Sequence, residues 1–166
     1  MKFILVLRDP VERAISDYTQ SLSKKQKSGS FETKAFSDNG EINLSFEPIR
    51  LSVYVNFFTN WLKYFNTSEI KIVDSAELIS RPWNVMHGLE SFLNIPHYLN
   101  ETAFFFNKTK GFYCLHNKPC LGETKGRKHF KIASKARKKL SRYYEQYNQM
   151  LHKISGYSFN CSFCGN

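Results

Sequence analysis

The feature that most constrains the fold is an apolar run near the start of the chain, Phe3-Ile4-Leu5-Val6-Leu7, which ends at Arg8. Because every position is apolar, and not every second one, the run predicts a strand buried on both faces, as in the interior of a parallel sheet. It is far too short to span a bilayer, and no small-residue cleavage site of a signal peptide follows it. Asp9 suits a helix N-cap and Pro10 the first helical position, so a helix is expected to begin directly after the strand.

Apolar periodicity predicts further helices and strands in alternation along the chain. We expect helices over about 47–65, from Pro82 and over about 133–154, a strand over 70–73, short extended pieces over 104–106 and 112–115, and a polar loop over 23–45. The apolar stripe of the last helix is predicted at Ala136, Leu140, Tyr143, Tyr147, Met150 and Ile154. This alternation indicates an α/β fold, a parallel sheet flanked by helices, with residues 1–166 in one domain.

The charge of the chain indicates an anionic partner. The formal net charge is +10, and Lys125 to Arg142 contains nine Lys or Arg residues and no acid. A nucleotide, a sulfated glycan, a nucleic acid or a membrane surface would each match this charge. No fingerprint of the common nucleic-acid-binding modules is present, which disfavours that class. For the later members of the basic run, a solvated helix face is as good an interpretation as a binding role.

The four cysteines form two close pairs, Cys114 with Cys120 and Cys161 with Cys164. Two such pairs can in principle bind a metal, but the first spacing is wider than in a zinc knuckle. A disulfide between Cys114 and Cys120 is the favoured alternative. Together with the cysteines, five Asn-x-Ser/Thr sequons lean toward the lumen of the secretory pathway, at Asn43, Asn66, Asn100, Asn107 and Asn160.

Arg8 and Ser16 form the first candidate site. Arg8 stands at the carboxyl end of the predicted strand, where ligands bind in open α/β sheets, and Ser16 lies two turns into the following helix. A guanidinium and a hydroxyl that converge from strand and helix can hold a phosphate. In the competing interpretation, Arg8 pairs with Asp17 or Glu12 and Ser16 is a neutral helix residue.

The second candidate site follows Tyr113 and the cysteine pair. Lys125 and Arg127 supply cationic donors, Gly126 allows the backbone to approach a ligand closely, and Tyr113 offers a ring face or a hydroxyl. Together these groups could clamp an adenosine and its phosphate. A basic surface loop is the competing interpretation.

These segments together resemble one family, the heparan sulfate glucosamine 3-O-sulfotransferases, in its C-terminal portion. The segments that carry the resemblance are 8–20 (Arg-Asp-Pro-Val-Glu-Arg-Ala-Ile-Ser-Asp-Tyr-Thr-Gln), 61–65, 70–73, 77–79, 90–93, 106–115 (Phe-Asn-Lys-Thr-Lys-Gly-Phe-Tyr-Cys-Leu) and 125–129 (Lys-Gly-Arg-Lys-His). The resemblance implies the P-loop-like sulfotransferase fold and 3′-phosphoadenosine 5′-phosphosulfate (PAPS) as co-substrate, without a metal. The acceptor would be the 3-hydroxyl of glucosamine in heparan sulfate.

The resemblance also implies roles for individual residues. Arg8 and Ser16 would bind the 3′-phosphate of PAPS, and Cys114 would be disulfide-bonded to Cys120. The cofactor site would be completed by Tyr113, Lys125, Gly126, Arg127, Lys128 and His129. The family acts in the Golgi lumen, and its membrane anchor has no counterpart in this sequence.

Two family features have no match here: the 5′-phosphosulfate loop, of the type Lys-Gly-Gly-Thr-Arg, and the glutamate that follows it as general base. Both are expected upstream of Met1, so we expect an N-terminally incomplete sulfotransferase domain and name no catalytic residue. The alternative is a non-catalytic remnant that binds heparan sulfate or nucleotide without turnover.

Overall fold

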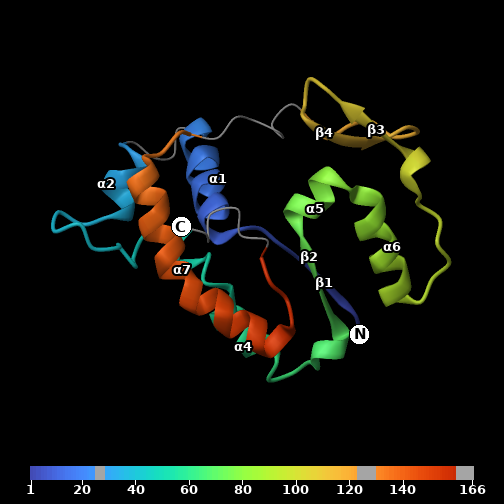
Figure 1. The fold of residues 1–166 in the computed structure, drawn as a ribbon, viewed down its shortest axis with the longest axis horizontal. Coiled ribbons are helices and arrows are strands. Elements are labelled where there is room, and N and C mark those ends of the chain that lie inside the picture. The colour runs from blue at the N-terminus through green and yellow to red at the C-terminus, as the bar shows by residue number, and fades with distance from the viewer. Residues whose placement is uncertain (25–28, 123–129, 160–166) are drawn as a thin grey trace. The chain divides into compact units, whose positions relative to one another are not determined.

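A computed structural model of the chain describes residues 1–24, 29–122 and 130–159 (Figure 1). The chain divides into two compact units, each of which is discontinuous in sequence. Unit 1 combines Met1–Leu7 with Phe65–Lys128, and unit 2 combines Arg8–Tyr64 with His129–Asn166. We describe each unit by itself.

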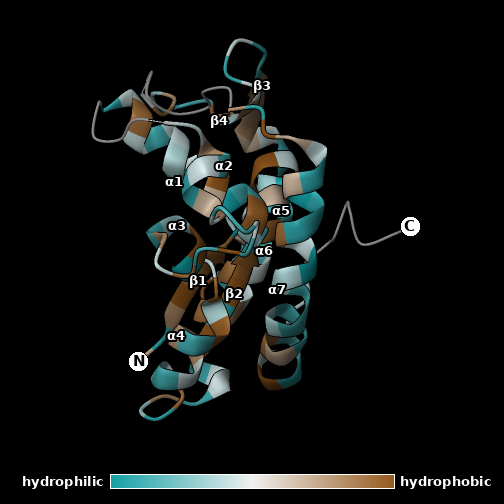
Figure 2. Ribbon diagram, turned by 90° about the vertical axis from the view of Figure 1, so that its left-hand side faces the viewer, coloured by the Kyte–Doolittle hydropathy of each residue, from teal (hydrophilic) through white to brown (hydrophobic). Residues whose placement is uncertain are grey.

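The sheet of unit 1 is formed by β1 (Phe3–Leu7) and β2 (Ile70–Asp74), which run parallel with Phe3 opposite Ile70 and Leu7 opposite Asp74. β1 is apolar at every position (Figure 2), as the sequence predicts, and β2 is apolar at Ile70, Ile72 and Val73. Within the described residues β1 pairs with β2 alone, and the side chains of Ile4 and Val6 are 40% and 53% exposed. β1 is therefore an edge strand here, whereas the sequence predicted an interior strand buried on both faces.

Two helices follow β2 directly in unit 1. Asp74 caps α5 (Ser75–Ser80) by accepting a hydrogen bond from the backbone nitrogen of Ala76 at 2.7 Å. α6 (Pro82–Leu93) has proline at its first position and ends at Asn94, whose φ of 59° is left-handed. α5 packs on both α6 and β2.

An antiparallel hairpin completes the regular part of unit 1. Its strands are β3 (Phe104–Asn107) and β4 (Phe112–Leu115), close to the extended pieces that the sequence predicts. Gly111, with φ of 72°, supplies the left-handed residue of the turn between them. Single turns of 3₁₀ helix, η1 (Thr67–Glu69) and η2 (Glu101–Ala103), precede β2 and β3.

Unit 2 is helical in its described part. Its helices are α1 (Pro10–Ser23), α2 (Phe31–Ala35), α3 (Glu47–Arg50), α4 (Tyr54–Trp61) and α7 (Ser134–Ser155). As predicted, α1 begins after Asp9, whose side chain accepts a hydrogen bond from the backbone nitrogen of Glu12 at 3.0 Å. α1 packs on α3 and α7, and α4 also packs on α7. The fully buried side chains at the centre of the unit include Ile15, Tyr18, Phe31, Ile49, Leu140 and Tyr144.

Three sequence predictions for unit 2 are corrected by the structure. The loop over 23–45 contains α2, where Ser30 caps the helix and Phe31 is buried. The single helix over 47–65 is two helices, interrupted at 51–53 where the Ser52 hydroxyl bonds to the Pro48 carbonyl at 2.7 Å. In α7 the buried stripe passes through Tyr144 and Leu151, one residue beyond the predicted positions, because spacing of about 3.6 residues per turn carries the face forward from Leu140.

None of the described helices is both long and apolar enough to cross a membrane.

Candidate functional site

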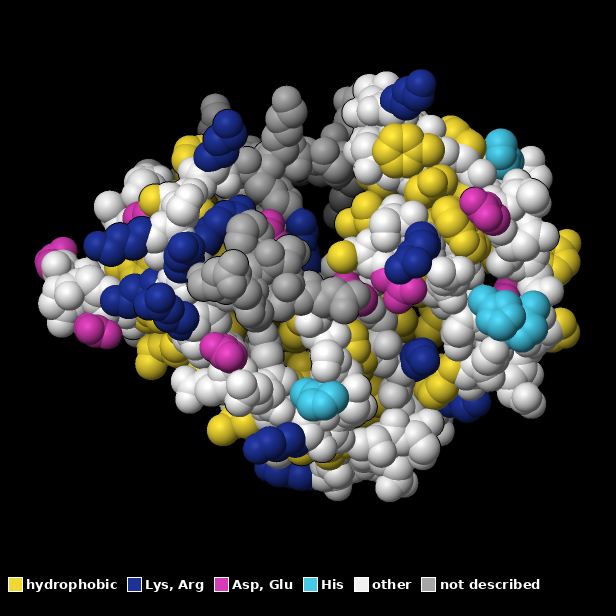
Figure 3. Space-filling model, viewed as in Figure 1, with side chains coloured by type: hydrophobic (Ala, Val, Ile, Leu, Met, Phe, Trp, Pro, Cys, Tyr) yellow, Lys and Arg dark blue, Asp and Glu magenta, His cyan; other side chains and the backbone are white. Residues whose placement is uncertain are grey.

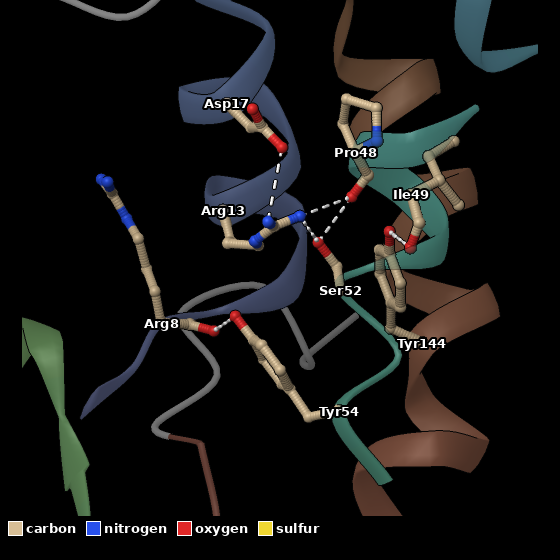
Figure 4. Close-up of polar contacts among 8 residues, drawn as sticks. All are labelled: Arg8, Arg13, Asp17, Pro48, Ile49, Ser52, Tyr54 and Tyr144. Atoms are coloured by element: carbon tan, nitrogen blue, oxygen red, sulfur yellow. Dashed lines mark hydrogen bonds and ion pairs between the residues drawn. The ribbon is translucent and has the colours of Figure 1, made fainter. Parts of the chain in front are cut away.

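Arg8 lies between β1 and α1, directly after the last residue of the strand. Its backbone carbonyl accepts a hydrogen bond from the Tyr54 hydroxyl at 2.9 Å. Its half-buried side chain extends away from Tyr54, and in Figure 4 no dashed line reaches the guanidinium. Within the described residues this guanidinium makes no hydrogen bond or ion pair. The backbone of Arg8 is thus fixed while its cation is available to a ligand.

The two acids that could have neutralised Arg8 are engaged by other arginines. Arg13 lies 3.4 Å from the Asp17 carboxylate, and Arg137 donates a hydrogen bond to Glu12. The interpretation in which Arg8 pairs with Asp17 or Glu12 is therefore wrong for this structure.

Arg13 has a structural role that the sequence did not reveal. Its guanidinium donates to the Pro48 carbonyl at 3.1 Å and to the Ser52 hydroxyl at 3.4 Å (Figure 4). These bonds tie α1 to the backbone around the break between α3 and α4. Of the two arginines near the start of α1, one is used for packing and the other, Arg8, is not.

Asp9 fixes the point at which the chain turns from Arg8 into α1. Its carboxylate caps the helix, and burial raises the pKa of the Asp9 carboxyl, while the hydrogen bond from the Glu12 backbone opposes that rise. The helix therefore begins one residue after Asp9, with Arg8 immediately before the cap.

Ser16 lies half-buried on α1, and its hydroxyl has no hydrogen-bond partner among the described residues. By helical spacing it shares one side of α1 with Glu12, one turn earlier, and Thr19, about one turn later. Both neighbours contact the chain that follows residues 123–129. The backbone nitrogen of Phe130 donates to the Thr19 hydroxyl at 3.3 Å, and Arg137 contacts Glu12. The segment that starts directly after His129 thus crosses the Ser16 side of α1.

Tyr113 belongs to β4, in unit 1. Its half-buried ring packs edge-on against Trp83, with centroids 5.1 Å apart, and against Phe106 at 5.2 Å. The hairpin around it is pinned by a disulfide between Cys114 and Cys120, with Cα atoms 5.4 Å apart. The disulfide agrees with the sequence prediction. Lys125, Gly126, Arg127, Lys128 and His129 lie outside the described residues, as do Cys161 and Cys164.

Tyr54 and Thr19, which contact the Arg8 carbonyl and the Phe130 backbone, are not predicted from the sequence as parts of a site. Tyr54 falls within the helix expected over about 47–65 and Thr19 within segment 8–20, but neither carries a predicted role. A tyrosine in a buried stripe usually finds a partner for its hydroxyl, so Tyr54 carried a usable signal. Thr19 also donates to the Ile15 carbonyl of its own helix at 2.8 Å, which is ordinary for a helical threonine and gave no signal.

The donor groups of Arg8 and Ser16 suit a phosphate. A guanidinium presents a planar fork of N–H donors that matches phosphate oxygens, and a hydroxyl adds one more donor. No three His, Cys, Asp or Glu side chains gather into a possible metal site in the described part of the chain. The guanidinium and the hydroxyl are both hydrogen-bond donors, the kind of group that an anion accepts from.

Comparison with known proteins identifies the family of the chain. A family model described as "Sulfotransferase domain" matches residues 1–156. Human heparan sulfate glucosamine 3-O-sulfotransferase 3B1 is 37% identical over 166 residues, covering 95% of this chain and 43% of the relative. Mouse heparan sulfate glucosamine 3-O-sulfotransferase 5 is 36% identical over 170 residues, covering 96% and 49%. The chain thus spans less than half the length of these relatives, whose similarity confirms the resemblance drawn from the sequence.

A solved structure shows the same fold. A crystal structure of a sulfotransferase from Alicyclobacillus acidocaldarius superposes with a TM-score of 0.68 at 15% identity, covering 95% of this chain and 56% of that one. At so low an identity the superposition concerns architecture alone, and it agrees with the α/β class predicted from the alternation of strands and helices. On the family match over nearly its whole length, the chain belongs to the sulfotransferase domain family.

Proposed function

We propose that this chain binds PAPS and forms part of an enzyme that transfers the sulfuryl group to the 3-hydroxyl of glucosamine in heparan sulfate. The family match and the names of the relatives support the reaction class and the acceptor. The observation that carries the proposal is the guanidinium of Arg8, which stands at the end of a parallel strand without a partner among the described residues while its neighbouring acids are occupied. Residues 1–166 then form part of one sulfotransferase domain.

Each proposed residue has a binding role. Arg8 and Ser16 hold the 3′-phosphate, the first as a charged fork and the second as a hydroxyl donor. Tyr113, Lys125, Gly126, Arg127, Lys128 and His129 complete the nucleotide site. Phe130, which follows His129, contacts Thr19 about one turn from Ser16. This contact supports a common site for Ser16 and the residues that directly precede Phe130. PAPS supplies the sulfuryl group, no metal is proposed, and we assign no general base to this chain.

The test is binding of 3′-phosphoadenosine 5′-phosphate, measured by titration calorimetry on the full chain. Hydrogen bonds to charged groups contribute about 1.5–3 kcal/mol, so Arg8→Ala should weaken binding by roughly tenfold to a hundredfold. Arg50→Ala is the matched control, since Arg50 is exposed and its side chain has no hydrogen bond or ion pair with a described residue.

A second ligand makes the test specific for the 3′-phosphate. Adenosine 5′-phosphate lacks this group, so its weaker binding should be the same in wild type and Arg8→Ala. Equal affinity of both proteins for 3′-phosphoadenosine 5′-phosphate would contradict the proposal. Heparin binding with no nucleotide binding at all would favour the non-catalytic remnant.

We further propose that the protein acts in the Golgi lumen. The disulfide between Cys114 and Cys120 suits an oxidising compartment. Two sequons, at Asn66 and Asn100, have exposed side chains, whereas the Asn43 and Asn107 amides donate to Lys34 and Cys120. Asn160 lies outside the described residues. In a secreting cell, glycosidase treatment should therefore raise the mobility of the chain, and Asn66→Gln with Asn100→Gln should reduce that change.

A further inference from the structure

α7 carries six Lys or Arg residues and one acid, Glu145, and the structure divides the cations into two groups. Arg137 and Lys139 face the rest of unit 2. Arg137 binds Glu12, and Lys139 donates to the Gly40 carbonyl and lies 5.7 Å from the centre of the Phe36 ring. These two cations hold the helix in place, so their presence is explained by packing.

The other four cations lie on the solvent side of the helix, and we call them the α7 stripe: Lys135, Lys138, Arg142 and Lys153. All four are exposed, and none has a hydrogen bond or ion pair with a described residue. Their spacings of three, four and eleven residues keep them on one face. At 1.5 Å per residue the stripe is about 27 Å long. Figure 3 shows Lys and Arg side chains gathered on the face over the beginning of α7.

The α7 stripe is electrostatically unfavourable without a partner. Lys138 lies about one turn from both Lys135 and Arg142, and like charges at this spacing repel each other. The first turn of α7 contains no acid, although acids are favoured there and cations are disfavoured by the helix dipole. An extended anion along the helix would convert this repulsion into attraction.

The surroundings of the α7 stripe select among polyanions. Polar side chains lie between the cations, among them Gln146 and Gln149, and the aromatic residues of α7 lie toward its buried side. Nucleic-acid bases would therefore find no ring on which to stack. The apolar face of the helix is buried at Ala136, Leu140, Tyr144 and Leu151, so that face cannot enter a lipid layer. A linear sulfated sugar chain needs only spaced cations and polar donors.

We propose that the α7 stripe is a contact surface for a sulfated glycosaminoglycan, separate from the nucleotide residues Arg8 and Ser16. The inference rests on the proposed function for the kind of polyanion. Such a surface would bind a part of the acceptor chain that is distant from the reacting sugar. It would raise the affinity for the acceptor without taking part in the transfer.

The experiment compares two triple variants of the full chain that lose the same charge. The stripe variant is Lys135→Gln, Lys138→Gln, Arg142→Gln, and the control is Arg50→Gln, Lys71→Gln, Lys118→Gln, all exposed residues without side-chain partners among those described. A heparin oligosaccharide is titrated at several salt concentrations. Taking the attraction of a Lys or Arg to an anionic surface as a guide, the stripe variant should lose roughly tenfold to a hundredfold in affinity and show a shallower salt dependence.

The outcomes separate this inference from the proposed function. Unchanged binding of 3′-phosphoadenosine 5′-phosphate with weakened heparin binding in the stripe variant alone supports the α7 stripe. Equal losses in both triple variants overturn it, because net charge would then suffice. Tighter binding of duplex DNA than of heparin through the same three residues, or equal binding of an unsulfated polymer of the same sugars, also overturns it. Failure of the Arg8→Ala test would remove the nucleotide site and leave this result standing.

Discussion

The hydroxyls of Tyr54 and Tyr144 each donate to a backbone carbonyl. Removing the hydroxyl should destabilise the fold more at Tyr54, although Tyr54 is the less buried of the two. Tyr54 is half-buried and donates to the Arg8 carbonyl at 2.9 Å, and no other described group donates to that carbonyl. Tyr144 is only 1% exposed and donates to the Ile49 carbonyl at 3.1 Å. That carbonyl also accepts from the Ser52 backbone at 3.1 Å, so it stays paired when the hydroxyl is removed.

Substitution by phenylalanine isolates the hydroxyl in each case. A buried acceptor left unpaired costs about 1–3 kcal/mol, and the partial exposure of Arg8 places Tyr54→Phe in the lower part of that range, about 1–2 kcal/mol. The ring contact of Tyr54 with Phe159, 5.9 Å between centroids, survives the change. Tyr144→Phe loses a bond without orphaning its acceptor and should cost about 0.5–1 kcal/mol.

Urea unfolding followed by circular dichroism at 25 °C measures both free energies of unfolding. Titration with 3′-phosphoadenosine 5′-phosphate adds a second readout, because Tyr54 fixes the backbone of Arg8 and Tyr144 does not contact it. We expect Tyr54→Phe to bind the nucleotide severalfold more weakly than the wild type. Tyr144→Phe should bind it with unchanged affinity. A larger stability loss for Tyr144→Phe, or equal nucleotide affinities, would refute the reasoning.

Three further predictions concern stability. Burial raises the pKa of Tyr54 to about 12 in the folded protein. As pH rises above about 10, the unfolded chain therefore loses this proton before the folded chain does. The free energy of unfolding should then fall with rising pH, and it should fall less steeply in Tyr54→Phe. Leu140→Ala, at a fully buried site, should cost about 2–5 kcal/mol in urea unfolding, whereas Leu44→Ala, 56% exposed, should change it by under about 0.5 kcal/mol. Cys120→Ser should lower stability by about 2 kcal/mol on the chain-entropy model, and reductant should lower the wild type equally but leave the variant unchanged.

The elements that the sequence predicted well are those whose signals are local. Asp9 and Pro10 mark the start of α1 by cap chemistry and fixed backbone geometry, and the structure places both as expected. The apolar runs that became β1 and β2 were equally clear. The disulfide followed from a close cysteine pair, with zinc disfavoured by its spacing.

The predictions that were wrong concern elements that depend on contacts between residues distant in sequence. The apolar stripe over 47–65 continues past Ser52, yet the helix stops there because Pro48 and Ser52 bond to Arg13 of α1. α2 lies in a polar stretch where Ser30 offers a local cap, but the packing of Phe31 against Tyr18 and Phe46 could not be read from the sequence. Tertiary contacts override local preference in both cases.

The candidate site also combines a local signal with contacts that the sequence does not reveal. Arg8 could be named because it follows a strand, but its availability depends on Arg13 and Arg137 occupying the nearby acids, which no local pattern reveals. The roles of Lys125, Gly126, Arg127, Lys128 and His129 remain predictions from the family resemblance.

The parallel pairing of β1 with β2 has a consequence for biosynthesis. Phe3 must find Ile70, yet residues 8–64, which lie between the strands, belong to the other unit. At roughly 5–20 residues per second, translation of the residues between β1 and β2 takes several seconds, and β1 is unpaired during that time. During that time Phe3–Leu7 exposes an uncharged, fully apolar segment of high β-propensity, the kind that associates with other nascent chains. Yield of native protein should therefore depend on chaperone supply more than the modest size of the chain suggests.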